Sequence, residues 1–373
     1  MIAQEFPQRE GLIYVNHAGV APWPRRTADA IKRFADGNAT QGPVDYAKWL
    51  IVEGELREQL RQLLNAPSAD DIALLKNTSE GLSVIAYGLP WQRGDNIVIS
   101  DQEFPSNRIV WESLQNQGVE LRQANLESGL SPEDALFGLA DNHTRLIAIS
   151  SVQYATGLRM DLERIGVFCR DNEILFCVDA IQSLGAFKMD VQAIHADFVV
   201  ADGHKWMLGP EGIAVFYCRA EGRDRLSLKQ YGWHMIEHQG DYDRTDWQIA
   251  KSARRFECGS PNMLGIHGLH ASLSLLFEIS INEIEKRILN VSRLLVNAIN
   301  ANDNLVLVSP DQVDRMSGII SFRQKHKTPG DIYRHLRDLG IYGAVRGGSV
   351  RLSPHFYIRS KQLEELMRLI NSL

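Results

Sequence analysis

Short apolar runs that alternate with helical stretches dominate the sequence between about residues 70 and 220. The runs are rich in Ile, Val, Leu and Phe and lie at residues 71–77, 95–101, 145–152, 174–180, 197–203 and 212–218. Amphipathic segments such as 106–117 and 162–171 lie between them and are bounded by turn residues. This alternation is typical of an α/β fold, in which helices cover both faces of a mainly parallel sheet.

The pattern changes after SPNMLG at residues 260–265, where a long helical stretch begins and continues to about residue 301. Residues 302–373 then predict a strand, a helix, a strand and a terminal helix, with strands at 306–309, 318–322 and 349–356. We therefore expect a large domain over residues 15–262 and a smaller α+β domain over residues 263–373. The amino-terminal segment, residues 1–14, is expected to pack nearby.

The composition excludes several classes of protein. With 44% hydrophobic residues and a net charge of −6, the chain has no basic excess to bind nucleic acid. It has no signal-like start and no apolar run of the roughly 20 residues that a membrane span needs. Its four cysteines form no CxxC pair, which argues against a metal site and a disulfide framework. We expect a cytoplasmic enzyme without metal, nucleic-acid or membrane partners.

Polar or aromatic side chains follow four of the predicted strands at the point where each strand ends. In an open parallel sheet, ligands bind beyond the carboxyl ends of the strands, so these side chains are candidates for a common site. In chain order they are Thr78 and Ser79, Phe104, Asp179 and Gln182, and His204 and Lys205.

Lys205 and Asp179 indicate the chemistry most directly. Lys205 stands in ADGHKWMLGPEG, where apolar neighbours lower the pKa of an amine and leave it neutral for imine formation. Asp179 ends a buried strand, where a carboxylate needs a cationic partner, and a protonated pyridine nitrogen would serve. The alternative interpretations are a surface lysine and a helix-capping aspartate.

Thr78, Ser79 and Phe104 suggest how a phosphorylated ring would be held. The segment NTSEGL follows a strand and opens a helix, so its hydroxyls and free backbone N–H groups can bind phosphate. Phe104, in DQEFPSN, can cover a planar ring. Helix capping and a core aromatic are the alternative interpretations.

The motifs NTSEG, EFPSN, VDAIQ, ADGHKW and RFECGSPN occur in an order and at a spacing that resembles the class V aminotransferase family. Cysteine desulfurase-like and isopenicillin N epimerase-like proteins are the most similar groups, and the resemblance runs from YVNHAGVAP to VRLSPHFYI. It implies a pyridoxal-phosphate (PLP)-dependent transferase fold, aspartate aminotransferase-like or fold type I. It also implies the cofactor pyridoxal 5'-phosphate and a homodimer whose subunits share the active site.

The resemblance also implies residue roles. Lys205 would hold PLP as a Schiff base and move the α-proton, and Asp179 would pair with the pyridine nitrogen. Further cofactor contacts would come from Phe104 on the ring, Gln182 on the ring oxygen, Thr78, Ser79 and His204 on the phosphate, and Ser260 on the phosphate of the neighbouring subunit. Arg351 would hold the substrate carboxylate, with His17 and Tyr154 also near the substrate. For His17 a structural role is an equal alternative.

Three positions depart from the family pattern. The loop between Arg346 and Arg351 is only GGSV, without the cysteine that desulfurases carry there. Asp202 stands where the family often has a phosphate-binding serine, so we expect it to point elsewhere or to bond His204. Tyr154 replaces an asparagine that touches substrate in desulfurase-like enzymes. Cys258 occupies a position that is usually small and inert.

The leading hypothesis is therefore an enzyme that acts on an amino acid through an external aldimine and an α-carbanion, as an aminotransferase or an epimerase. One alternative is a C–S lyase resembling cysteine desulfurase or selenocysteine lyase but lacking the catalytic cysteine. Another is a non-catalytic PLP-binding regulatory protein. The sequence leaves open the choice of amino acid and the choice among transamination, epimerisation and β-elimination.

Overall fold

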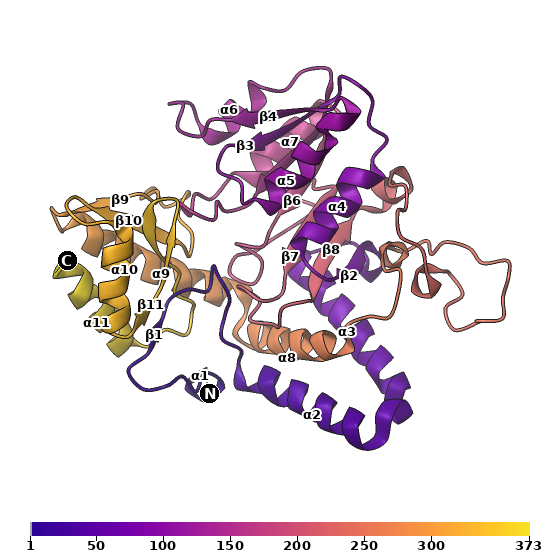
Figure 1. The fold of residues 1–373 in the computed structure, drawn as a ribbon, viewed down its shortest axis with the longest axis horizontal. Helices are drawn as coiled ribbons and strands as arrows, with labels where there is room; N and C mark the ends of the chain where they lie inside the picture. Colours follow the sequence, from indigo (N-terminus) through magenta and orange to yellow (C-terminus); the bar gives the residue numbers. More distant parts are fainter. Residues whose placement is uncertain (1) are drawn as a thin grey trace.

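The computed structural model describes residues 2–373, which form a large body built on one sheet and a smaller carboxyl-terminal body (Figure 1). The large sheet has seven strands. In spatial order they are β2 (Ile72–Leu75), β8 (Ala214–Cys218), β7 (Phe198–Asp202), β6 (Leu175–Asp179), β5 (Thr144–Ser150), β3 (Asn96–Ser100) and β4 (Glu120–Ala124).

The sheet is mainly parallel, as the sequence predicts. Strands β4, β3, β5, β6 and β7 pair in parallel, whereas β8 is antiparallel to both β7 and β2. All six predicted strands of this region form within a few residues of the expected bounds. The prediction missed β4, whose sequence ELRQA is polar because it lies at the sheet edge and is only partly buried.

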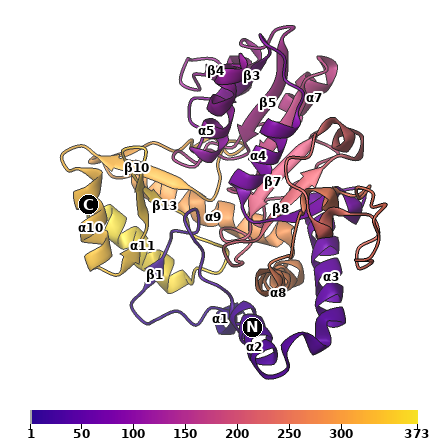
Figure 2. The same cartoon turned by 45° about the vertical axis from the view of Figure 1, so that its right-hand side comes forward.

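Helices cover both faces of this sheet, which explains why its strands are apolar without alternation. Phe176 and Val178 of β6 belong to one buried cluster, while Cys177 between them belongs to the other. The first face is covered by α3 (Tyr46–Leu64), α6 (Pro132–Phe137), α7 (Leu162–Asp171) and α8 (Met263–Ile279). The second face is covered by α4 (Thr78–Gly88) and α5 (Ser106–Glu112). Helix α2 (Arg25–Gln41) packs on α8 at the outside (Figure 2).

The smaller body is an antiparallel sheet with helices on one side. Its four strands are, in spatial order, β12 (Ala344–Arg346), β13 (Ser349–Leu352), β10 (Ile320–Gln324) and β9 (Leu305–Leu307). The helices are α9 (Ile281–Asn300), α10 (Pro329–Asp338) and α11 (Ser360–Asn371). The amino-terminal segment reaches this body, since β1 (Ile13–Tyr14) pairs in parallel with β11 (Ile341–Tyr342) after the short helix α1 (Ile2–Glu5).

The helical stretch predicted from 266 to 301 is two helices rather than one. Helices α8 and α9 meet at Ser280, which has a positive φ of 74°, and their axes differ by 80°. Ser280 ends α8 and caps α9, because its hydroxyl accepts a hydrogen bond from the backbone of Glu283. The division between residues 262 and 263 stays a prediction, although α8 packs on α2 and α3 of the large body.

Among residues 2–373, no single helix has the length and apolar character needed to cross a membrane. The bent pair α8 and α9 meets that requirement only when the two helices are counted together.

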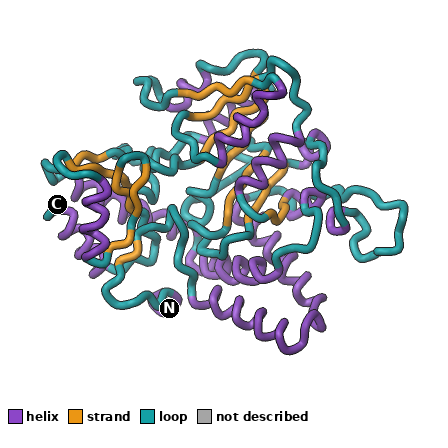
Figure 3. Tube along the Cα trace, viewed as in Figure 1, coloured by secondary structure: helices purple, strands orange, loops and turns teal. Residues whose placement is uncertain are grey.

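The segment between β8 and α8, residues 219–262, is mostly loop and extends well away from the sheet (Figure 3). A buried cluster of charged residues joins the carboxyl-terminal part of this segment to the large body. The guanidinium of Arg57 donates to both oxygens of Glu257, at 2.6 and 2.8 Å, and to Glu53 at 2.6 Å. Glu257 also accepts a hydrogen bond of 2.8 Å from the backbone N–H of Leu74 in β2.

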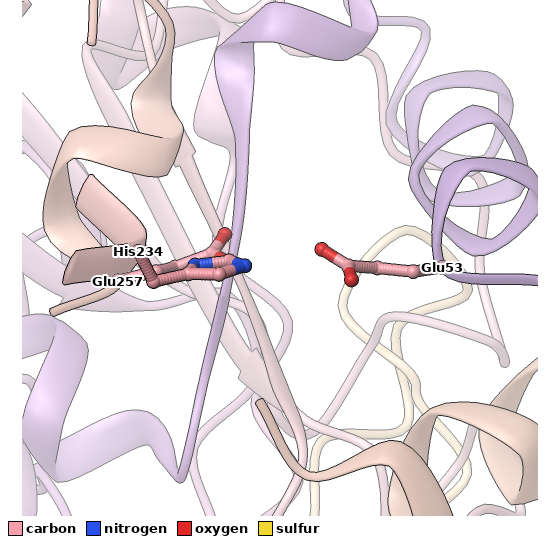
Figure 4. Close-up of side chains that lie close together, drawn as sticks. All are labelled: Glu53, His234 and Glu257. Atoms are coloured by element: carbon pink, nitrogen blue, oxygen red, sulfur yellow. The ribbon is translucent and has the colours of Figure 1, made fainter. Parts of the chain in front are cut away.

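His234 completes this cluster, with its Nδ1 atom 3.5 Å from Glu257 and its ring facing the carboxylate of Glu53 (Figure 4). Two carboxylates and an imidazole are donors that suit a divalent metal. Here the guanidinium of Arg57 already bonds to both carboxylates, so a second cation would meet a buried positive charge. The cluster is therefore a structural anchor for the long segment.

We predict that Arg57→Met destabilises the protein by about 3 kcal/mol or more, because it leaves two buried carboxylates without a cation. Calorimetric melting measures the effect. The matched control is Arg61→Met on the same helix. Arg61 pairs with Glu58 in a more exposed position, so its replacement should change the melting temperature much less. Equal melting temperatures for the two variants would contradict the assignment.

Candidate active site

The predicted site residues converge at the carboxyl edge of the large sheet. Asp179 ends β6 and Asp202 ends β7, while Thr78 begins α4 directly after β2. Parallel strands bring their carboxyl ends to one edge, so residues distant in sequence meet there. They line a cavity of about 290 Å³. Its lining includes Thr78, Ser79, Phe104, Tyr154, Asp179, Gln182, Asp202, His204, Lys205 and Arg351.

Lys205 lies in the cavity with only 9% of its surface exposed. Burial lowers the pKa of its amine to about 8, although the nearby carboxylate of Asp179 opposes the shift. The following residues, Trp206 to Leu208, are fully buried, which accounts for the apolar surroundings that the sequence predicts. The amine lies 5.6 Å from the centre of the Phe104 ring. A buried lysine with this pKa is suited to bond with an aldehyde near neutral pH.

Asp179 is 2% exposed, and burial raises the pKa of its carboxyl to about 7. A hydrogen bond of 3.0 Å from the backbone N–H of Ile181 and the charge of Lys205 act in the opposite direction. A cationic ring nitrogen in the cavity would hold this carboxyl ionised. The arrangement therefore fits the role that the sequence assigns to Asp179.

Thr78, Ser79 and His204 gather at the start of α4. The hydroxyl of Thr78 is buried without a hydrogen-bond partner among the described residues, and that of Ser79 donates to Ser106 at 2.8 Å. Asp202 accepts a hydrogen bond of 3.3 Å from the backbone N–H of Thr78 and lies 3.2 Å from Nδ1 of His204. Asp202 and His204 are therefore close, but the two facing atoms form no hydrogen bond within residues 2–373.

Phe104 and Gln182 are placed to hold a planar ring. Phe104 is 40% exposed and meets Tyr154 edge to face, with ring centres 5.2 Å apart. The amide of Gln182 donates to the backbone of Ala18 at 3.1 Å and accepts from the indole of Trp206 at 3.0 Å. These two bonds fix which end of the amide is the donor.

Arg351 is a buried cation without an acidic partner among residues 2–373. It is 1% exposed and donates to the carbonyl oxygen of Tyr154 at 2.8 Å and to the side chain of Asn16 at 3.3 Å. Its Nε atom has no hydrogen-bond partner within the described residues 2–373. Burial, followed by the charge of Arg346, lowers its pKa to about 10. A buried guanidinium bonded only to neutral groups is suited to receive a substrate carboxylate.

Two predicted site residues lie outside this cavity. Both ring nitrogens of His17 are bonded, one to the carbonyl of Ser353 at 2.8 Å and one to the hydroxyl of Tyr357 at 2.6 Å. Burial lowers the pKa of His17 to about 4, so it is a neutral structural histidine, the alternative that the sequence left open. Ser260 lines a separate cavity together with Cys258, and its role toward a neighbouring subunit stays a prediction.

The structure adds residues that the sequence analysis did not select. Ser150, paired with Asp179 across β5 and β6, lines the cavity and donates to the buried carboxylate of Glu103. Glu103 also accepts hydrogen bonds from Asn107 at 2.8 Å and Gln153 at 3.0 Å. Ser150 ends β5, but it lies inside the predicted strand 145–152, so its place at the strand end was not predicted. Arg346 also lines the cavity.

A fold of this kind, with a buried lysine opposite a buried carboxylate, defines a PLP-dependent enzyme of fold type I. The unpartnered Thr78 hydroxyl fits a phosphate, Asp179 fits a pyridinium and Lys205 fits the aldehyde.

Comparisons with known proteins agree with this assignment. The model of the family described as aminotransferase class-V matches residues 13–369, so the chain belongs to that family. A probable cysteine desulfurase from Methanothermobacter thermautotrophicus is 29% identical over 98% of this chain and 95% of its own length. A cysteine desulfurase from Klebsiella pneumoniae is 32% identical over 79% of this chain and 71% of its own.

Solved structures share the fold. A C-DES variant with glycine covalently linked to its PLP cofactor superposes with a TM-score of 0.91 at 21% identity, covering 100% of this chain and 99% of that one. The cystine C–S lyase C-DES, in complex with its product cysteine persulfide, gives 0.89 at 22% identity, covering 96% and 97%. The predicted fold class and the cofactor pyridoxal 5'-phosphate are confirmed.

We predict that the rate at which PLP attaches to the apoprotein rises with pH up to about 8 and then levels off, because only the neutral amine of Lys205 reacts. Absorbance after mixing with excess PLP measures this rate. Lys205→Ala is the control and should retain no borohydride-fixed cofactor. A rate that rises up to the ordinary lysine pKa of 10.5 would exclude a lowered pKa.

Proposed function

We propose that the protein is a C–S lyase that breaks the bond between Cβ and sulfur in a cysteine-type amino acid, without a cysteine nucleophile of its own. The observation that carries this proposal is a cavity that holds Lys205 and the unpaired Arg351 but is lined by no cysteine. The curated relatives are named cysteine desulfurases, which supports a sulfur amino acid as substrate.

None of the chain's four cysteines is placed to attack sulfur. Cys169, Cys177 and Cys218 are buried in the core, and burial raises the pKa of each thiol. Cys258 is half-buried in the separate cavity, where its thiol donates to Gln230 at 3.3 Å. The position of the desulfurase nucleophile is a two-residue turn, Gly347 and Gly348, between β12 and β13.

The relatives' names do not support the leading expectation of an aminotransferase or an epimerase, nor its classification as a transferase. They favour the alternative that the sequence left open, a lyase of the desulfurase group. The absent nucleophile then distinguishes this chain from enzymes that pass sulfur to their own cysteine.

Arg351 and Lys205 have different roles in the proposed reaction. Arg351 binds the α-carboxylate and so orients the Cα–H bond toward Lys205, whose neutral amine takes the α-proton. When bound, PLP supplies the electron sink that stabilises the charge left at Cα. The Cβ–S bond then breaks with its electron pair remaining on sulfur, which takes a proton. The three-carbon remainder takes up water, so cysteine yields hydrogen sulfide, pyruvate and ammonia.

The proposal includes a homodimer in which Ser260 contacts the phosphate of the partner's cofactor. Its support is that Ser260 is exposed and lies outside the cavity of its own chain. The cytoplasmic location stays a prediction.

The test is a product analysis of the holoenzyme with L-cysteine and L-cystine. We expect pyruvate and ammonia in equal amounts, with sulfide from cysteine and persulfide from cystine. Cys258→Ser should retain this activity, because Cys258 lies outside the cavity. Formation of alanine in place of pyruvate, or loss of activity in Cys258→Ser, would identify a desulfurase with its own nucleophile. Accumulation of the aminated cofactor would identify an aminotransferase.

Replacement of Arg351 tests the carboxylate site. We predict that Arg351→Gln raises KM for the amino acid by about tenfold or more, because a charge-assisted bond to the carboxylate is lost. Steady-state kinetics measure the change. The PLP absorbance and the melting temperature serve as controls for folding, and an unchanged KM in a folded variant would remove Arg351 from this role.

A further inference from the structure

The hairpin of β12 and β13 places two arginines on one face of the smaller sheet. Ala344 pairs with Arg351, and Arg346 pairs with Ser349. Side chains alternate along a strand, so residues two apart share a face, and paired residues share it too. Arg346 and Arg351 are therefore diagonal neighbours, and both line the cavity that holds Lys205.

The turn that joins the two strands fixes Arg346 at the rim of the cavity. Gly347 and Gly348 have φ angles of 54° and 68°, the left-handed pair that a two-residue hairpin turn requires. A Cβ atom at Gly347 would lie 3.0 Å from that of Ala155, so the turn packs against the residue that follows Tyr154. Arg346 is the last residue before this turn and is exposed.

Neither arginine is neutralised by an acid within residues 2–373. Arg346 donates only to the adjacent carbonyl oxygen of Val345, at 2.8 Å, and Arg351 donates only to neutral groups. Of the acids that line the cavity, Asp179 lies near Lys205, and Asp202 accepts a hydrogen bond from the backbone N–H of Thr78. Two like charges on one face of a small cavity repel each other, so a ligand with two anionic groups would be favoured there.

The cofactor phosphate would not neutralise Arg346 or Arg351. Its candidate ligands lie at the start of α4 in the large body, whereas both arginines belong to the smaller sheet. Arg351 is 1% exposed and Arg346 is exposed, so the two sites differ in depth. A substrate whose α-carboxylate binds Arg351 deep in the cavity would direct its side chain outward, toward Arg346.

We propose that Arg346 binds a second carboxylate at the far end of the substrate's side chain. Resting on the proposed function, this makes the substrate a cysteine derivative whose sulfur substituent ends in a carboxylate, with L-cystine and S-carboxymethyl-L-cysteine as members of the class. Arg346 is then a specificity-determining residue, and unsubstituted cysteine is a poorer substrate.

Binding by the holoenzyme tests the inference without C–S cleavage. L-2-aminoadipate and L-norleucine have side chains of similar length, contain no sulfur, and differ in the second carboxylate. We expect calorimetric titration to show about tenfold tighter binding of aminoadipate, and Arg346→Gln to remove that preference. Arg346→Lys should restore part of it, because the ammonium keeps the charge without the planar fork.

Arg337→Gln is the control. Arg337 is exposed on α10 of the same body and does not line the cavity, so the preference should survive its replacement. Equal binding of the two ligands by the wild-type enzyme, or an equal loss of preference in the Arg337 and Arg346 variants, would overturn the inference.

Kinetics separate this inference from the proposed function. If the inference is right, Arg346→Gln lowers kcat/KM for L-cystine more than for L-cysteine, by about tenfold in the ratio. Wild-type enzyme that cleaves no C–S bond yet prefers aminoadipate through Arg346 would refute the lyase and support the second carboxylate site. If the ratio of kcat/KM for L-cystine to that for L-cysteine is the same in wild-type and Arg346→Gln enzyme, the second carboxylate site is refuted and the lyase function still stands.

Discussion

The active site depends on burying two opposite charges, Lys205 and Asp179, at the carboxyl edge of one sheet. Burial shifts both pKa values toward neutrality, so the amine becomes a usable base and the carboxyl becomes dependent on a cationic partner. Neither shift would occur on the surface. The apolar strands beneath, packed on both faces, exclude the water that would otherwise screen these groups.

The smaller body supplies what the sheet edge lacks, a means of holding an amino acid. Arg351 reaches the cavity from β13 and is left without an acidic partner, which suits it to a carboxylate. The two-residue turn at Gly347 and Gly348 contains no cysteine and places Arg346 at the rim of the cavity. Both the proposed reaction and the proposed substrate class rest on this hairpin.

Much of the fold and of the site was predictable, because the chemistry lies next to strong local patterns. The strands of the large sheet are continuous apolar runs, and the cofactor residues follow them directly. The prediction missed β4, whose edge position leaves a polar sequence, and the break at Ser280, because apolar residues at helical spacing continue on both sides of it. The role of His17 was not decidable, since its partners Ser353 and Tyr357 are distant in sequence.

The sequence by itself determined the fold class and the cofactor and selected Lys205 as the candidate lysine, because apolar periodicity and motif order are properties of the chain alone. Only the tertiary structure decided which charged groups remain unpaired. That property depends on contacts between residues far apart, such as the lack of an ion pair for Arg351 among residues 2–373 and the shared face of Arg351 and Arg346. Charge balance in a cavity is set by packing, and packing is fixed only when the two bodies meet.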